Sequence, residues 1–432
     1  MNYGGITRPV HLVSTPLTYV HDYRLGLREL GGVERIYGSV RVEGDAKANR
    51  AVRVEIPELQ LSLSLKTDRK GDAAFDVPVE NLERWSPNAP RLYDVSVAID
   101  GGAKIADKIG FRTVSVSGQE VRLNGAPIFL KGISVHEEPI GPDGGRKMTF
   151  DDARKLLGAA KELGANFVRL SHYPHNERTL RVADELGLLV WSEIPIYWEE
   201  ISYDNPHTIA VANRMYKDTI NRDYNRASIA IWGVANETPI STQRNEFLKN
   251  LIDFVKSHDD TRLVSAALNR NTSEGDDTFI VDDPLGEHLD ILAVNEYEGW
   301  YGERTLDEVP GVRWRTPYDK PMMFSEFGAG ALKDFHGERL ERFTEEHQRA
   351  FYEVTLKMAE EIPFLAGISP WILKDFRSPR RWHPRFQSYW NRMGLISETG
   401  EKKPAFETLK NWYASYDGPH AAAAEAGRPG EE

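Results

Sequence analysis

The sequence contains no cysteine. Disulfide bridges, zinc–thiolate sites and cysteine nucleophiles are therefore excluded. The sequence also lacks a run that is long and apolar enough to span a bilayer, and its first residues show neither the basic nor the apolar segment of a secretory leader. We therefore expect a cytoplasmic protein without a membrane partner.

Positive charge is in deficit. The chain has 54 Lys and Arg residues against 66 Asp and Glu residues, which gives a formal net charge of -12. Such a surface repels nucleic acid and anionic membranes. We therefore expect no nucleic-acid partner.

Short runs of alternating apolar and polar residues occupy residues 33–117. They are separated by turn residues such as Gly71-Asp72, and examples lie at 36–42, 53–56 and 92–99. This alternation is typical of half-buried strands, and about eighty residues of this kind predict a small immunoglobulin-like β-sandwich. Residues 1–32 lack such a period, so we expect an N-terminal arm there.

From residue 118 to residue 416, apolar strands alternate with amphipathic helices. The predicted strands lie at 128–132, 167–170, 188–191, 229–233, 263–266, 291–294, 322–325 and 367–371, and four predicted helices lie near 149–163, 176–186, 207–224 and 243–258. An eightfold alternation predicts a (β/α)8 TIM barrel, with a doubly wound sheet as the lesser alternative. The tail 417–432 is rich in Ala, Gly and Glu and is expected to be disordered.

Reactive side chains of a TIM barrel lie just past the C-terminal ends of its strands. Here these positions hold carboxylates, aromatic residues and asparagine, a combination typical of sugar-binding sites. They include His136, Glu138, His172, Asn236, Glu237, Tyr297, Tyr301, Glu326 and Trp371. A carboxylate pair suits glycoside hydrolysis, because one group protonates the leaving oxygen and the other acts from the opposite side of the sugar. Retaining and inverting geometries both stay open at this point, since the sequence does not give the carboxylate separation.

His136 and His172 could alternatively be metal ligands. Histidines at the strand ends of a barrel more often bind substrate hydroxyls or neighbouring carboxylates, and the sequence has no HExxH motif or other tight ligand cluster. We therefore expect no metal and no cofactor.

Several motifs in this order resemble glycoside hydrolase family 2, the β-galactosidase and β-glucuronidase family, over nearly the whole chain. The segments that carry the resemblance are Gly110-Phe111-Arg112, residues 124–132, His136-Glu137, Ser171-His172-Tyr173-Pro174, residues 232–237 and residues 324–328. The resemblance implies that Glu237 is the acid/base and Glu326 the nucleophile of a retaining enzyme. It further implies that Asn236 binds the sugar 2-hydroxyl and that Trp371 stacks on a sugar face.

Within this family, residues 295–301 are most similar to the glucuronidase branch. That branch has two active-site tyrosines in the corresponding segment. The similarity implies that Tyr297 hydrogen-bonds the nucleophile, that Tyr301 lines the pocket and that Glu138 faces the distal hydroxyls of the sugar. His136 and His172 are expected to bind substrate as well.

One departure concerns the substrate carboxylate. Glucuronidases bind it with an Asn-x-Lys motif, whereas this chain has Asn391-Arg392-Met393, and methionine offers no charge. A guanidinium group suits bidentate carboxylate binding, and the nearby candidates are Arg377, Arg380, Arg381, Arg385 and Arg392. A β-glucuronide or β-galacturonide is the expected substrate, with Asn391, Arg377 and Arg392 among its ligands, and a neutral β-hexoside such as a β-galactoside stays open.

A second departure lies at the beginning of the sequence. Family members open with a jelly-roll sugar-binding domain, and residues 2–10 resemble only its end. We therefore expect a homo-oligomer that covers the surface this domain would shield. The expected function is that of a retaining exo-β-glycosidase. The alternative, a carbohydrate-binding protein without activity, does not explain why both glutamates are present.

Overall fold

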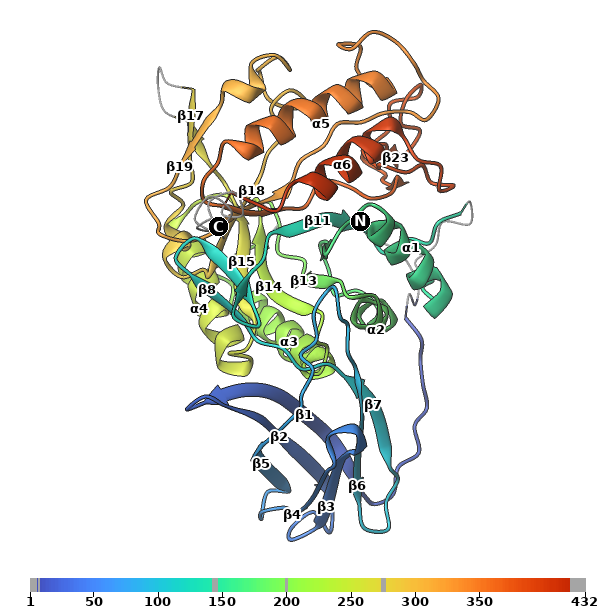
Figure 1. Ribbon diagram of the computed structural model, residues 1–432, viewed down its shortest axis with the longest axis vertical. Coiled ribbons are helices and arrows are strands. Elements are labelled where there is room, and N and C mark those ends of the chain that lie inside the picture. Colours follow the sequence, from blue (N-terminus) through green and yellow to red (C-terminus); the bar gives the residue numbers. More distant parts are fainter. Residues whose placement is uncertain (1–5, 7, 142–146, 199–200, 273–276, 420–432) are drawn as a thin grey trace, which may run out of the picture.

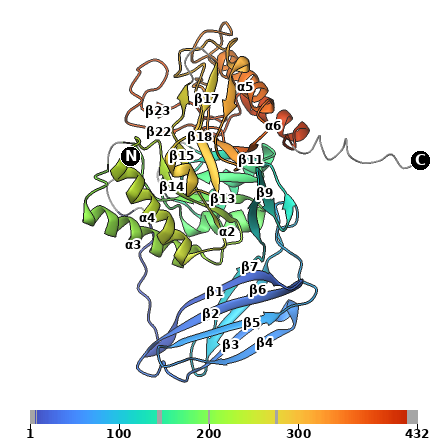
Figure 2. The same cartoon turned by 90° about the vertical axis from the view of Figure 1, so that its left-hand side faces the viewer.

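The structure, a computed structural model, describes residue 6 and residues 8–141, 147–198, 201–272 and 277–419. The β-sandwich lies at one end of the long axis and helix α5 (Glu345–Glu360) at the other, with the barrel between them (Figures 1 and 2). The predicted fold class, a sandwich plus a TIM barrel, is confirmed. The tail expected at 417–432 lies outside the described residues from 420 onward, as do residues 1–5 and 7 of the expected arm. No described helix is long and apolar enough to cross a membrane.

Two antiparallel sheets form the sandwich, with strand orders β1-β2-β5 and β4-β3-β6-β7. The strands are β1 (Thr18–Leu30), β2 (Val33–Gly44), β3 (Ala51–Ile56), β4 (Leu61–Lys66), β5 (Asp72–Pro78), β6 (Tyr93–Ile99) and β7 (Ile105–Ile109), and the 3-10 turn η1 (Pro57–Leu59) joins β3 to β4. Alternation buries Val52, Val54 and Ile56 and leaves Arg53 exposed. The period-two pattern of the sequence therefore places the core of this domain correctly.

The boundary expected between an arm and the sandwich at residue 33 is wrong. Strand β1 belongs to the sandwich, because it pairs with β2 from Thr18↔Gly44 to Leu30↔Val33. Two features hide its alternation in the sequence. The register shifts between Val20 and Asp22, and Gly26 leaves room for the ring of Tyr37, to which an added Cβ would come within 2.7 Å. A strand with a shifted register and a glycine at a packed position does not show a clean period of two.

A small sheet closes the bottom of the barrel. It consists of β8 (Val114–Ser117), β9 (Glu120–Leu123) and β10 (Ala126–Pro127), in the order β10-β9-β8. Val121 and Leu123 of this sheet share a buried cluster with barrel residues such as Leu130 and Phe167. The expected domain boundary at residue 118 therefore falls in the turn of the β8–β9 hairpin, whose two strands pair with each other.

Eight parallel strands close the barrel, in sequence order, and all eight predicted strands are confirmed. They are β11 (Leu130–Val135), β12 (Phe167–Leu170), β13 (Leu189–Glu193), β14 (Ile229–Asn236), β15 (Leu263–Leu268), β18 (Ile291–Asn295), β20 (Met322–Glu326) and β21 (Leu365–Ile368). The closure makes the C-terminal ends of all eight strands meet at one rim.

Helices cover the outside of the barrel (Figure 1). The four predicted helices are confirmed as α1 (Phe150–Glu162), α2 (Glu177–Leu186), α3 (Pro206–Asp223) and α4 (Thr242–His258), and α6 (Pro404–Ser415) packs against α5. Each helix from α1 to α5 has a side-chain cap at its N-terminus. The capping residues, in chain order, are Thr149, Asn176, Asn205, Ser241 and Thr344. Each cap satisfies a backbone N–H that the first helical turn leaves without a partner. The remaining short elements are β16 (Asn271–Thr272), β17 (Thr278–Ile280), β19 (Arg313–Arg315), β22 (Phe376–Arg377), β23 (Trp390–Asn391), η2 (Pro284–Glu287) and η3 (Val309–Gly311).

The Gly110-Phe111-Arg112 motif lies at the junction of sandwich and barrel. Arg112 is buried and donates hydrogen bonds to the carbonyls of Ala227, Thr261 and Ile229 on the barrel. A Cβ at Gly110 would lie 2.7 Å from the Trp85 ring. The motif is therefore a structural one that fixes the sandwich to the underside of the barrel.

Candidate active site

Both predicted catalytic glutamates lie at the rim of the barrel. Glu326 is the last residue of β20, and Glu237 directly follows Asn236, the last residue of β14. The two strands are separated by β15 and β18 in the closed order of the barrel. Their carboxylates therefore approach the same opening from opposite sides.

Glu326 is nearly buried and is held on both oxygens. Arg169 Nη1 donates to its Oε1 at 2.7 Å, and the Tyr297 hydroxyl donates to its Oε2 at 2.8 Å. His172 Nε2 lies 3.5 Å from Oε1. Burial raises the pKa of Glu326, and the neighbouring Arg169 and His172 offset part of that rise. Burial also raises the pKa of Tyr297 well above its ordinary value, so its hydroxyl stays protonated and is the donor.

Glu237 has a different environment. Trp198 Nε1 donates to its Oε2 at 2.8 Å, and Asn295 Nδ2 donates to its Oε1 at 2.8 Å. These donors are neutral, whereas Glu326 faces a guanidinium group. Glu237 is also less buried than Glu326, which is 5% exposed. The two carboxylates therefore differ in burial and in the charge of their partners, and such differences let two carboxylates take different roles.

The backbone at Glu237 is unusual. Its φ angle is 51°, in the left-handed region, and the register of β14 against β15 shifts between Gly233 and Asn236. A hydrogen bond from Glu237 N to the carbonyl of Ala267 at 3.0 Å holds this conformation. Left-handed backbone at a residue other than glycine costs about 1 kcal/mol and is enriched at functional sites. Here it directs the carboxylate into the opening of the barrel.

A hydrogen-bond network joins the two glutamates. Arg169 Nη2 donates to Asn236 Oδ1 at 2.8 Å, and Asn295 Nδ2 donates to the same oxygen at 3.2 Å. Arginine has no acceptor, so the Asn236 atom that faces it is the oxygen. No acceptor among the described residues takes a hydrogen bond from Asn236 Nδ2, so this amide can donate to a ligand.

Aromatic rings form a floor beside the network. The rings of Trp371 and His172 stack at 5.2 Å and 13°, and His136 meets Trp371 edge-on at 5.2 Å. His172 Nδ1 lies 2.6 Å from Glu193 Oε1. Burial would raise the pKa of Glu193, but Arg169 and His172 outweigh it and lower the pKa. The structure thus brings His136, His172 and Trp371 together, as expected.

The other predicted ligands lie farther out or in different surroundings. Glu138 is 1% exposed and accepts a hydrogen bond from Arg377 N at 3.1 Å. Tyr301 is 52% exposed, and its ring centroid lies 5.1 Å from that of Tyr297, at the outer edge of the opening. The Arg377 guanidinium carbon lies 4.7 Å from the Trp390 ring centroid.

Arg392 and Asn391 have internal roles. Arg392 is buried and forms ion pairs with Asp375 and Glu398. Asn391 Oδ1 accepts a hydrogen bond from Met393 N at 2.9 Å. The sequence suggested Arg392 as a carboxylate ligand, but two internal carboxylates already bind its guanidinium group.

Sequence reasoning missed three residues of this site. They are Arg169, Glu193 and Trp198. A signal existed for Arg169, because a charged residue inside the apolar run Phe167–Leu170 must point into the barrel and find a partner there. Trp198 lies in a loop, where no pattern predicts its direction.

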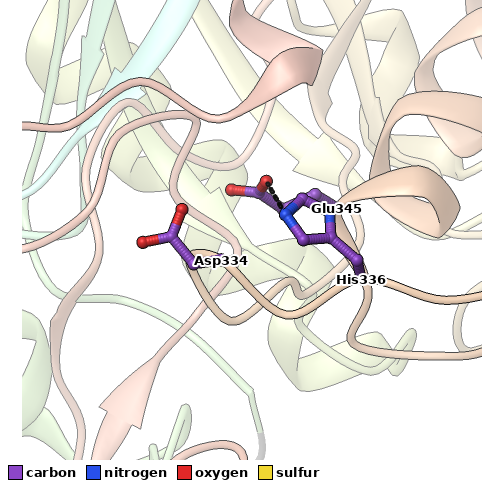
Figure 3. Close-up of side chains that lie close together, drawn as sticks. All are labelled: Asp334, His336 and Glu345. Atoms are coloured by element: carbon purple, nitrogen blue, oxygen red, sulfur yellow. Dashed lines mark ion pairs between the residues drawn. The ribbon is translucent and has the colours of Figure 1, made fainter.

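The described residues contain one group that could offer three metal ligands: Asp334, His336 and Glu345 (Figure 3). Asp334 and His336 lie between β20 and α5, and Glu345 is the first residue of α5. The ion-pair partners of this group are Lys333 and Glu346, not Glu237 or Glu326. Lys333 forms ion pairs with both carboxylates, at 3.3 Å to Glu345, and thus supplies the positive charge that a metal would bring. His336 pairs with Glu346 at 2.8 Å, which raises the His336 pKa. We assign this group as an ion-pair cluster.

Family models match both domains. The model described as "Glycosyl hydrolases family 2, TIM barrel domain" matches residues 114–416, and the one described as "Glycosyl hydrolases family 2" matches residues 21–112. The first match begins at β8, which agrees with the barrel boundary of the structure.

Curated relatives are similar over nearly the whole chain. The beta-glucuronidase of Canis lupus familiaris is 27% identical over 98% of this chain and 66% of its own length. The beta-glucuronidase of Streptococcus agalactiae serotype V is 27% identical over 95% of this chain and 70% of its own length. The chain thus spans about two thirds of the length of these relatives.

Solved structures show the same fold. The GH2 beta-galacturonidase of Eisenbergiella tayi bound to galacturonate aligns with a TM-score of 0.80 and 25% identity, over 93% of this chain and 73% of that one. The beta-glucuronidase of Bifidobacterium dentium complexed with coumarin-3-O-glucuronide aligns with a TM-score of 0.81 over 93% of this chain and 67% of that one. The Bifidobacterium dentium enzyme is 24% identical to this chain, and its similarity shows the fold alone.

Proposed function

The chain belongs to glycosyl hydrolases family 2, and from that premise we propose that it is a retaining exo-β-glycosidase that acts on a β-linked hexuronide, either a β-glucuronide or a β-galacturonide. The observation that supports the reaction best is the pair Glu237 and Glu326, set at one rim in unlike surroundings and joined through Asn295, Asn236 and Arg169.

These surroundings support the following mechanism. Glu326 attacks C1 of the bound sugar, while Glu237 gives its proton to the leaving oxygen, so that the C1–O bond breaks as the C1–Glu326 bond forms. Glu237, now a carboxylate, takes a proton from water, and the resulting hydroxide attacks C1 and releases Glu326. The sugar leaves with its original configuration after two displacements.

Other residues bind and orient the sugar in this proposal. Asn236 Nδ2 donates to the 2-hydroxyl, a bond that strengthens in the oxocarbenium-like transition state. Trp371 stacks on one sugar face, with His136 and His172 beside it. Arg169 and Tyr297 each bind one oxygen of Glu326 and so hold its carboxylate in position to attack C1.

The uronide part of the proposal rests on the relatives and on the cations Lys374 and Arg377 beside the Trp390 ring. A neutral β-hexoside is the second candidate, because Met393 is apolar and 3% exposed where the glucuronidase branch has lysine. The homo-oligomeric state and the cytoplasmic location expected from the sequence stay predictions.

A panel of nitrophenyl β-glycosides tests the substrate. It should contain the glucuronide, galacturonide, galactoside, glucoside, mannoside and xyloside. We expect a uronide to have the highest kcat/KM. A neutral sugar with the highest value would refute the uronide part, and no hydrolysis of any member would favour a carbohydrate-binding protein without activity.

Tyr297→Phe should move the acidic limb of the kcat/KM profile to higher pH. The Tyr297 hydroxyl stabilises the Glu326 carboxylate and lowers its pKa. Loss of this donor raises that pKa, so a larger fraction of Glu326 is protonated and unable to attack at a given pH. The pH dependence of kcat/KM reports this group in the free enzyme. Tyr301→Phe is the matched control, because the Tyr301 hydroxyl has no bond to Glu326 among the described residues, and its acidic limb should stay in place. An unmoved limb in Tyr297→Phe would contradict the role given to Glu326.

A further inference from the structure

Lys374 is a buried ammonium group with an incomplete set of partners. It follows β21 and is 4% exposed. Its Nζ donates one hydrogen bond, to the carbonyl of Asp375 at 2.9 Å. An ammonium group has three donors, and no carboxylate of the described chain forms an ion pair with Lys374. Two of its donors are therefore left for a ligand.

Lys403 shows how this chain satisfies a lysine that is purely structural. It is as deeply buried as Lys374, at 1% exposed. Its Nζ donates to both oxygens of Asp375 at 2.9 and 3.1 Å, to the carbonyl of Ala331 at 2.7 Å and to that of Arg392 at 3.1 Å. A buried charge normally needs such partners. The contrast indicates that the described part of the chain does not supply the missing partner of Lys374.

The chain around Lys374 turns this side chain toward the sugar pocket. Asp375 points to the interior, where it binds Lys403 and Arg392. The neighbouring Phe376 lies on the pocket side, with its ring centroid 4.2 Å from that of His136. Burial lowers the pKa of Lys374, and the charge that opposes this shift most is that of Glu138. Lys374 therefore lies on the side of Glu138, the residue expected at the distal hydroxyls of the sugar.

Lys374 lies close to Met393, the residue that stands where the glucuronidase branch has the lysine of its Asn-x-Lys motif. The two residues lie on adjacent segments, since Ile372 N donates to the carbonyl of Met393 at 3.3 Å and Lys374 forms a bridge with Ile396. Arg377 lies nearby, because its guanidinium carbon and Lys374 Nζ lie 4.7 and 5.8 Å from the centroid of the same Trp390 ring. Arg392 lies near this ring as well, but Asp375 and Glu398 bind it. Among these cations, Lys374 is the buried one whose N–H donors are not all bound within the described chain.

We propose that Lys374 binds the C6 carboxylate of the hexuronide and takes the place of the lysine that Met393 replaces, an assignment that rests on the proposed function and specifies its substrate class. The carboxylate accepts hydrogen bonds from the two remaining donors of Lys374. A neutral hexoside has a hydroxymethyl group there and leaves the buried charge without a counter-ion. Selectivity for the uronide follows from that unpaired charge.

The test compares pairs of nitrophenyl glycosides that differ only at C6: β-galacturonide with β-galactoside, and β-glucuronide with β-glucoside. For wild type, the ratio of kcat/KM for the preferred uronide to that for its neutral partner should be well above one. Lys374→Met should lower this ratio at least about 100-fold, because removing one partner of a buried charge pair has effects of this size. Lys402→Met, which changes an exposed neighbour paired with Glu162, should leave the ratio unchanged.

Three further measurements separate binding from a structural role. The thermal midpoint of Lys374→Met should fall by no more than about 2–4 °C, because the lysine has few internal partners to lose. The exchange variant Lys374→Met/Met393→Lys, which restores lysine at the family position, should recover part of the lost ratio. Calorimetric binding of free galacturonate or glucuronate, against galactose or glucose, gives the same comparison without turnover.

The outcomes distinguish this assignment from the proposed function. An unchanged ratio in Lys374→Met, with both rates reduced equally, would overturn the role of Lys374 and leave the hexuronidase intact. A wild type that prefers the neutral partner would overturn the uronide part of the proposed function and this assignment with it. A large loss of thermal stability in Lys374→Met, without recovery of the ratio in the exchange variant, would also overturn it.

Discussion

Glu326→Ala should lower kcat/KM for the preferred nitrophenyl uronide by about 10³-fold or more, a loss of the size seen when a catalytic nucleophile is removed. Without the carboxylate, no group can form the bond to C1 from the face opposite the leaving group. Added azide should restore release of nitrophenol, because this small anion fits the space left by the side chain and attacks C1 there. The product should be the α-glycosyl azide, formed by a single displacement.

Glu296→Gln is the control for this loss. Glu296 also lies at the rim, is 1% exposed, and burial raises its pKa to about 7 although Arg270 opposes the shift. Its Oε2 binds Arg270 and its Oε1 accepts from Glu298 N, so its bonds are internal. We expect a loss of less than about tenfold in Glu296→Gln, because the amide oxygen still accepts a hydrogen bond and the change removes no group that reacts with C1. An equal loss in both variants, or no azide product from Glu326→Ala, would contradict the assignment of the nucleophile.

Glu237→Ala should lower the rate strongly for substrates with a poor leaving group and little for those with a good one. An alkyl β-uronide needs a proton on its leaving oxygen, and the loss of a general acid typically costs about 10²–10⁴-fold. A dinitrophenyl β-uronide releases a stable anion, so formation of the glycosyl-enzyme should be nearly unaffected. Steady-state rates on both substrates, with the burst of dinitrophenol for the second, measure this difference.

Glu246→Ala supplies the control for Glu237→Ala. Glu246 is an exposed residue of α4, near Glu237 in sequence but outside the network of the rim. The rates of this variant on the alkyl and the dinitrophenyl uronide should equal those of wild type. A loss in Glu237→Ala that is the same for alkyl and dinitrophenyl uronides would contradict its role as the acid.

The spacing of apolar residues in the sequence predicts most of the fold, because the positions of most strands and helices depend only on which residues are buried. All eight barrel strands are apolar runs such as Ile229–Asn236, which is buried throughout, and the long helices have one apolar face. Strand β1 escapes this reasoning. Its register shift and the close packing of Gly26 against Tyr37 depend on the partner strand, which local sequence does not specify.

The candidate site is predictable where it depends on strand ends. The rule that reactive groups follow the strands locates Glu237 and Glu326, because that position depends on topology alone. The rule does not find Trp198, whose position depends on a loop. It also does not distinguish Arg392 from Lys374. Both are cations near strand eight, and the choice depends on which of them already has carboxylate partners inside the protein.

The proposed mechanism requires a covalent intermediate on Glu326 of a uronide-cleaving enzyme. The most direct measurement is mass spectrometry of the protein and of its peptides after incubation with a 2-deoxy-2-fluoro-β-uronosyl fluoride. Fluorine at C2 slows both displacements by destabilising the oxocarbenium-like transition state, and the fluoride leaving group lets the first one proceed, so the intermediate accumulates. We expect one added fluoro-uronosyl group, located on the peptide that contains Glu326. A label on another residue, or an active enzyme that never becomes labelled, would contradict it.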